Sequence, residues 1–246
     1  MDKYVETKGF DLVFMQETGT SDQAKLILSN MKCVSDLNQA CNRGCALFTK
    51  DCYSITGLDQ ISSMSKNIDT AWGLEIIKNN RYIVGSVYCK LNYASAIDDI
   101  IAMLTQAKQM CAQHRAKGII LAGDLNARHE AWGDTTSNQY GRDLLAKLDL
   151  TEYSIIAPET PTFLTETGSS VIDLIIVSNN LADSIEAPKT DKEVELYSGA
   201  PFRGHLPITT SITGVPPREN ICRIKNSLDG VDWATKSRRE CLYQFK

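Results

Sequence analysis

The chain has 246 residues, 43% of them hydrophobic and 23% charged, values that are ordinary for one large globular domain with a buried core. Its formal net charge of −4 argues against a protein that coats nucleic acid, because such proteins neutralise phosphates with Lys and Arg. An enzyme that acts on a phosphate is not excluded, since clustered carboxylates can hold a metal ion that meets the phosphate.

The sequence predicts neither a membrane segment nor a secretion signal. Its apolar runs, such as residues 118–123, are far shorter than the ~20 residues of a membrane-spanning helix. The opening MDKYVETKGF has no basic flank, apolar stretch or cleavage site, so we expect a nuclear or cytoplasmic protein that is not secreted. The eight cysteines are expected to be free thiols. A structural zinc on Cys41, Cys45 and Cys52 is disfavoured, because no CxxC pair occurs.

Short apolar runs bounded by turn residues predict strands over residues 11–16, 45–50, 72–78, 82–88, 118–124, 171–178 and 206–212. A helix is expected over residues 96–115, where Ile97, Ile100 and Leu104 follow the spacing of one helical face. Ser95, three residues before Asp98, predicts a capping box for it.

Two further helices are expected, one over residues 140–148 and a short one before residue 11. This mixture of strands and helices predicts an α/β layered domain.

The consecutive prolines that follow residue 213 predict the end of the sheet. We therefore expect a domain over residues 1–213 and a C-terminal linker or tail over residues 214–246. The tail carries seven Lys or Arg against four acids, which would permit contact with nucleic acid. A solvated linker to a downstream segment is the favoured interpretation.

Four of the predicted strands carry polar residues suited to one metal-assisted site. Glu17 follows the first strand, although a carboxylate at a strand end usually faces solvent. Asp124 and Asn126 in GDLNARHEAWG are two positions apart, so an extended backbone points both side chains to one face. There a carboxylate can activate a water and an amide can donate to phosphate. An Asx-type turn with Gly123 at its corner is the alternative interpretation of this pair.

Asp173 and His205 complete the set of candidates. Asp173 lies within the apolar strand of SSVIDLIIVS, where an unpaired carboxylate would cost several kcal/mol, so it needs a partner. His205, in RGHLPI, is a plausible one. An aspartate and a histidine brought together at strand ends can set tautomer and charge for phosphate chemistry.

In their order and separations, the QET, GDLNARHEAWG, SSVID and GHLPI segments resemble the DNase I-like endonuclease/exonuclease/phosphatase superfamily, over residues 1 to about 212. Within that superfamily, the GDLNAxHxxWG form, the IDLIIVS strand and GHLPI resemble the endonuclease domains of non-LTR retrotransposons. The tail resembles the linker that precedes the reverse transcriptase in such polyproteins.

This resemblance implies a four-layer α/β sandwich, with two β-sheets face to face and helices outside. By this resemblance, Glu17 would ligate Mg²⁺ and Asp124 would activate the attacking water. Asn126 would bind the phosphate and Tyr88 would lie near it. His205 would contact the scissile phosphate, with its ring oriented by Asp173. Asn92 is a weaker candidate, because an extra residue separates it from Tyr88. Mg²⁺ suits a site of hard oxygen ligands, and Mn²⁺ is an alternative.

Two features depart from the family pattern. The family opens with a strand that bears an Asn, whereas this chain begins in the following helix, so the first strand is expected to be missing and the strand over residues 11–16 to lack a partner on one side. The family also has Asp before the final histidine, where this chain has Gly204. A metal or water contact is expected to be lost there.

Three functions remain open on the sequence. The first is an endonuclease that nicks DNA and leaves a 3′-hydroxyl for target-primed reverse transcription, with a reverse transcriptase downstream in the same polyprotein. The second is a phosphoesterase of the same fold that acts on a lipid or inositol phosphate, which the lack of an obvious headgroup-binding insertion disfavours. The third is a degenerate, non-catalytic copy, which Gly204 and the missing strand favour. The first is favoured by the intact Glu17, Asp124, Asn126, Asp173 and His205.

Overall fold

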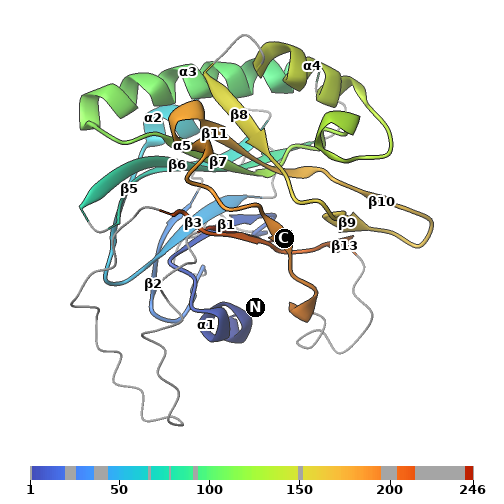
Figure 1. Ribbon diagram of the computed structural model, residues 1–246. Coiled ribbons are helices and arrows are strands. Elements are labelled where there is room, and N and C mark those ends of the chain that lie inside the picture. Colours follow the sequence, from blue (N-terminus) through green and yellow to red (C-terminus); the bar gives the residue numbers. More distant parts are fainter. Residues whose placement is uncertain are drawn as a thin grey trace.

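Two six-stranded sheets, packed face to face, form the centre of the computed structural model (Figure 1). The structure describes residues 2–19, 26–35, 44–65, 68–77, 79–90, 94–148, 152–194, 204–213 and 242–245. Helices lie outside both sheets, so the chain has the four-layer α/β sandwich that the motifs indicated. Among the described residues, no helix is both long and apolar enough to cross a membrane.

Sheet A is the lower of the two in Figure 1. Its strands follow the spatial order β12 (Lys189–Thr190), β14 (Ile208–Thr210), β15 (Leu242–Phe245), β1 (Leu12–Gln16), β3 (Cys45–Lys50) and β2 (Met31–Ser35).

The expectation that β1 lacks a partner on one side is wrong. Strand β15 pairs with β1 in parallel, with Phe14 opposite Gln244, and with β14 in the antiparallel sense. Residues of the predicted tail therefore fill the position beside β1, so the consecutive prolines Pro216 and Pro217 do not exclude a later strand from the same sheet.

Sheet B lies above sheet A, in the spatial order β4 (Ser54–Gly57), β5 (Ile68–Ile77), β6 (Asn80–Cys89), β7 (Ile119–Asp124), β11 (Asp173–Ser178) and β8 (Tyr153–Ile156). Strands β6 and β7 are parallel, and helix α3 (Ala96–His114) connects them. Gly123 is required there, because a Cβ at this position would lie 1.8 Å from the carbonyl oxygen of Val87.

A small third sheet joins the two large ones at one end. Its strands follow the order β10 (Ser169–Ser170), β9 (Phe163–Leu164) and β13 (Gly204–His205). Figure 1 shows β9 and β10 as a hairpin that projects from the sandwich.

Alternation along β1 explains the layers on the sheet A side. Leu12 and Phe14 point into the core between the two sheets, whereas Val13 and Met15 pack with helix α1 (Asp2–Lys8) on the outer face. Helices α3 and α4 (Gln139–Leu148) cover the outer face of sheet B (Figure 1). The remaining helical turns of the described residues are α2 (Asp59–Ser62), α5 (Asn179–Ala182), η2 (Glu130–Trp132) and η3 (Lys192–Val194).

The predicted capping box of α3 is absent. Ser95 is the N-cap residue but makes no side-chain capping bond, and its backbone lies at φ −97° and ψ 10° rather than in the extended region that capping requires. Asp98 instead forms an ion pair with Lys147 of α4. Cys33, Cys45, Cys52, Cys89 and Cys111 are free thiols as expected, and Cys41 lies outside the described residues.

Candidate active site

Three strands of sheet B bring the first group of candidate residues into one row. Tyr88 on β6 pairs with Asp124 on β7, and Asp124 pairs with Asp173 on β11. Because paired neighbours share a face of a sheet, the three side chains all point into the space between sheets A and B. All three are buried, with Asp124 0% exposed.

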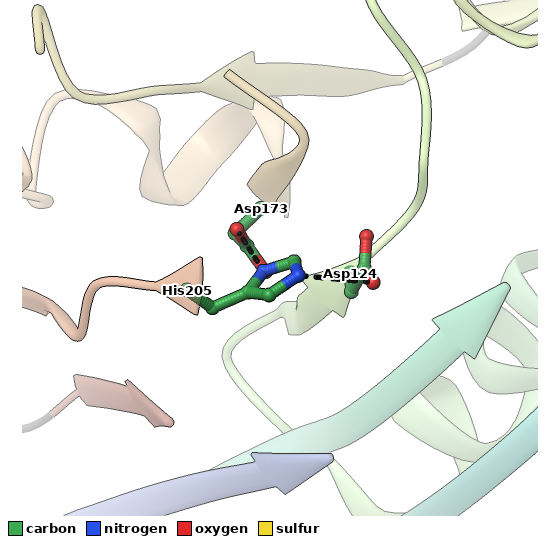
Figure 2. Close-up of side chains that lie close together, drawn as sticks. All are labelled: Asp124, Asp173 and His205. Carbon is green, nitrogen blue, oxygen red and sulfur yellow. Dashed lines mark hydrogen bonds and ion pairs between the residues drawn. The ribbon is translucent and has the colours of Figure 1, made fainter. Parts of the chain in front are cut away.

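His205 lies between the two aspartates, as Figure 2 shows. Its Nδ1 is 2.7 Å from Oδ2 and 2.9 Å from Oδ1 of Asp173, and its Nε2 is 3.9 Å from Oδ2 of Asp124. A carboxylate at Nδ1 accepts a hydrogen bond from the N–H there, which fixes the tautomer and leaves Nε2 facing Asp124. The His205 side chain is only 8% exposed, and its ring packs against that of Phe163 at 4.4 Å between centroids.

Thr162, which sequence reasoning missed, fixes the position of this pair. Its Oγ1 accepts hydrogen bonds from the backbone N–H groups of Ile172 and Asp173, both at 3.1 Å. Its carbonyl oxygen accepts from the N–H of Leu206 at 2.6 Å, one residue beyond His205. One fully buried residue thus joins the backbones that carry the acid and the histidine. The only sequence signal was a small polar residue before the short strand β9.

Asn126 lies beside Asp124, but the expected extended backbone between them is wrong, because β7 ends at Asp124 and a turn brings the two side chains together. Its backbone has φ +49°, and its N–H donates to Oδ1 of Asp124 at 3.0 Å, which is an Asx-type arrangement. Its amide Nδ2 donates to the carbonyl oxygen of Cys89 at 2.7 Å and lies 3.3 Å from Oδ2 of Asp124. An Asx turn is therefore present, as the alternative interpretation expected, but Gly123 is not at its corner, because Gly123 lies within β7 and the turn begins at Asp124.

Asn138 holds the loop after β7 in place. Its Nδ2 donates to the carbonyl oxygen of Asn126 at 2.7 Å, and its Oδ1 accepts from the N–H groups of Arg128 and Gly141. The last of these bonds caps α4. A Cβ at Gly141 would lie 1.9 Å from the carbonyl oxygen of Arg128, so only glycine permits this close approach.

Asp134 ties the same loop to the strand that carries Asp173. It forms an ion pair with Arg128 at 2.8 Å and accepts a hydrogen bond from the N–H of Val171 at 2.8 Å. Burial raises the pKa of the Asp134 carboxyl, but the hydrogen bonds from Arg128, Val171 and Thr136 outweigh it and lower the pKa below its ordinary value. Asp134 therefore remains a charged anchor at neutral pH.

Glu17 follows directly on β1 and is half-buried, with φ +52°. The preceding Gln16 donates from Nε2 to Oγ of Ser86 at 2.8 Å, and Ser86 donates to the carbonyl oxygen of Met15 at 2.9 Å. These bonds hold the end of β1 against β6, near Tyr88. Asn92 lies outside the described residues, so its place in the site is not tested.

The residues present fit a divalent cation. Ligand atoms of Asp124, Asp173 and His205 all lie within 4.8 Å of one another, and Glu17 is not part of this group. Because Asp173 already holds Nδ1, His205 could offer only Nε2 to a cation or a phosphate. Hard cations prefer oxygen ligands, so the carboxylates are the better donors and the histidine is better suited to phosphate. The role of Glu17 as a ligand remains a prediction.

Solved structures with the same architecture define the class. The endonuclease domain of TRAS1, a telomere-specific non-LTR retrotransposon, matches with a TM-score of 0.65 and 17% identity, over 86% of this chain and 90% of its own. The AP endonuclease LMAP from Leishmania major matches with a TM-score of 0.65 and 14% identity, over 84% and 79%. A mannosyl-6-phosphatase from Bacteroides thetaiotaomicron matches with a TM-score of 0.53 and 16% identity, over 86% and 88%. At these identities the likeness establishes the fold.

The chain thus has the fold of the DNase I-like endonuclease/exonuclease/phosphatase superfamily, as its motifs indicated. Within that class, the family described as endonuclease-reverse transcriptase matches residues 82–199, which include Tyr88, Asp124, Asn126 and Asp173. The resemblance to retrotransposon endonucleases is confirmed by this match and by the TRAS1 domain. No curated protein matches the chain.

Proposed function

We propose that this chain is a divalent-metal-dependent endonuclease that hydrolyses a phosphodiester bond of DNA and leaves a 3′-hydroxyl. The observation that carries the proposal is the arrangement of His205 between Asp173 and Asp124. The family match and the likeness to a retrotransposon endonuclease support DNA as the substrate. The phosphatase neighbour shows that the fold alone does not select it.

Each side chain of this site has one role in the proposed hydrolysis. Asp124, which is fully buried and accepts a hydrogen bond from the backbone N–H of Asn126, orients the attacking water and accepts its proton. His205, whose Nδ1 is held by Asp173, would donate from Nε2 to an oxygen of the scissile phosphate as the imidazolium, the form that carries a proton on both ring nitrogens. Asn126 would donate from Nδ2 to the same phosphate in exchange for its long bond to Oδ2 of Asp124, and Tyr88 would donate from its hydroxyl. Mg²⁺ or Mn²⁺, bound through Glu17, would supply the positive charge that stabilises the leaving oxygen.

The nick would serve target-primed reverse transcription, in which the new 3′-hydroxyl is the primer. This proposal makes a reverse transcriptase domain downstream in the same polyprotein the partner, and nuclear DNA the site of action. The match to a family described as endonuclease-reverse transcriptase supports it.

Nicking of supercoiled plasmid tests the function. We expect open-circular product with Mg²⁺ or Mn²⁺ and none with EDTA, and we expect the nick to be extended by a DNA polymerase because it carries a 3′-hydroxyl. Asp124→Asn and His205→Ala should each lower the rate about 10²-fold or more, with an unchanged circular dichroism spectrum. Exposed Glu130→Gln is the matched control.

Nicking that persists in EDTA would contradict the metal mechanism, and wild-type rates in both site variants would contradict the site. A folded wild-type chain that nicks nothing at any cation concentration would point to the degenerate copy. Release of phosphate from an inositol phosphate or phosphoinositide, without nicking, would point to the second candidate function.

A further inference from the structure

Asp69 lies in the same row of sheet B as the candidate site, although no sequence motif includes it. It pairs with Tyr88 across β5 and β6, as Tyr88 pairs with Asp124 across β6 and β7. The carboxylates of Asp69, Asp124 and Asp173 therefore share the inner face of the sheet at one end of the sandwich. Asp69 is 0% exposed. A neutral side chain would fill this position at a lower cost, because a buried carboxylate must be compensated by hydrogen bonds.

The Asp69 side chain reaches from sheet B to sheet A. Its Oδ2 accepts a hydrogen bond from the backbone N–H of Gly44 at 3.0 Å, and Gly44 immediately precedes β3. The backbone of Gly44 lies at φ +77°, a conformation that glycine adopts without strain. The carbonyl oxygen of Gly44 in turn accepts from the N–H of Thr18 at 3.3 Å. Two hydrogen bonds thus connect the buried carboxylate to the residue after Glu17.

Glu17 needs such support, since φ +52° is uncommon for a residue other than glycine and persists only where neighbouring contacts hold it. We propose that Asp69 is a positioning residue: it fixes Gly44, and through Gly44 the Thr18 backbone, and so holds Glu17 in the orientation that binds the divalent cation. This inference rests on the proposed role of Glu17 as metal ligand. Asp69 itself would not touch the cation or the DNA.

Amide hydrogen exchange in the presence of EDTA tests the positioning without any metal. Asp69→Ala should raise the exchange rates of the Gly44 and Thr18 amides about tenfold, because the local structure opens more often. Asp69→Asn keeps an acceptor oxygen for the Gly44 N–H and should stay close to wild type. The matched control is Thr49→Val, which removes the buried inter-sheet hydrogen bond to Glu75 farther along β5 and should leave the Gly44 and Thr18 amides unchanged.

Calorimetric titration with Mn²⁺ then tests the consequence. Asp69→Ala should weaken Mn²⁺ binding about tenfold relative to wild type, as loss of outer support typically does, with kcat at saturating Mn²⁺ within about twofold. Asp69→Asn should restore the affinity, and Thr49→Val should not lower it. The proposal is overturned if Asp69→Ala leaves the two amides as protected as in wild type, or exposes them without weakening Mn²⁺ binding. A wild-type chain that binds Mn²⁺ but nicks no DNA contradicts the proposed function and leaves this test of Asp69 intact.

Discussion

Thr162 shows at the residue scale how one buried hydroxyl sets the geometry of a polar pair. The distance between Asp173 and His205 depends on two segments from different parts of the chain, and Thr162 bonds to both backbones. Sequence reasoning could predict that a carboxylate in an apolar strand needs a partner. It could not predict the residue that sets the distance between them, because that residue lies in a third segment.

Thr162→Val keeps the shape of the side chain but removes the acceptor for two buried N–H groups, those of Ile172 and Asp173. Each unsatisfied buried donor costs about 1–3 kcal/mol, so the melting temperature should fall by several degrees. Misplacement of Asp173 should also lower kcat about tenfold. Thr162→Ser, which keeps the hydroxyl, should lose much less of both. Thermal denaturation and plasmid nicking measure the two effects, and a valine variant equal to wild type in both would contradict the role of Thr162.

Gly204 occupies the position where the family resemblance led us to expect an aspartate, and its backbone conformation explains why replacement by aspartate would be strained. Gly204 has φ +122°, which residues with a side chain rarely adopt, at a cost of about 1–3 kcal/mol. Gly204→Asp and Gly204→Ala should therefore lower the melting temperature by similar amounts. A plasmid-nicking rate that is higher in the aspartate variant than in the alanine variant would show that the backbone at position 204 has relaxed and that the new carboxylate reaches the site.

At the scale of elements, the sequence predicted the long, strongly patterned segments. Helix α3, strand β7 and strand β3 lie within a residue or two of the expected bounds, because each buries a continuous apolar face. Strands β9, β10 and β13 were missed, because a strand of two residues is too short to show the alternation of apolar and polar residues that identifies a strand. They nevertheless build the site, because Gly204–His205 pairs with β9.

Removal of strand β15 should destabilise sheet A. Its backbone pairs with β1 on one side and with β14 on the other, so a chain that ends at Thr213 would leave both strands with unpaired hydrogen-bonding groups. We expect a melting temperature lower by several degrees and increased light scattering on heating. Removal of Lys246 alone, which leaves β15 in place, is the control. Equal stability of the two chains would show that β15 contributes nothing to closure of sheet A.

For the whole molecule, the motifs predicted the sandwich architecture correctly, but they did not predict that β15 pairs between β1 and β14 in sheet A. The order of the motifs along the chain matches the family pattern, from Glu17 through Asp124 and Asp173 to His205. That match was enough to predict the four-layer sandwich. The position beside β1 follows from a contact between residue 14 and residue 244, which no local pattern can indicate. Hydrogen bonds between the two sheets, such as the one from Gly44 to Asp69, could not be predicted either. The sequence does not show that a polar residue will be buried or which residue will be its partner.

Glu75 provides a pH dependence that belongs to the whole sandwich. It is 0% exposed between the sheets, its Oε1 accepts from Oγ1 of Thr49 at 2.6 Å, and its Oε2 has no hydrogen-bond partner among the described residues. The pKa of Glu75 is raised from 4.5 to about 8. Burial is the largest cause of this rise, the Thr49 hydroxyl opposes it, the charge of Asp11 adds to it and the charge of Lys32 opposes it.

The sign of the effect on stability follows from this raised pKa. Below pH 4.5 the carboxyl is protonated in both the folded and the unfolded chain, so it does not change the free energy of unfolding. Between pH 4.5 and about 8 the unfolded chain loses the proton while the folded chain keeps it, so stability falls as the pH rises. Above about 8 the loss is complete.

Glu75→Gln keeps an acceptor for Thr49 and cannot ionise. It should match wild type in melting temperature near pH 4.5 and exceed it by several degrees at pH 8.5, with the difference growing between these values because only the wild type loses stability there. Scanning calorimetry at a series of pH values measures this difference. Glu130→Gln, at an exposed position, should show no such growth. A Glu75→Gln curve that stays parallel to wild type from pH 4.5 to 8.5 would mean that Glu75 ionises as readily in the folded chain as in the unfolded one, through water or a cation that reaches between the sheets.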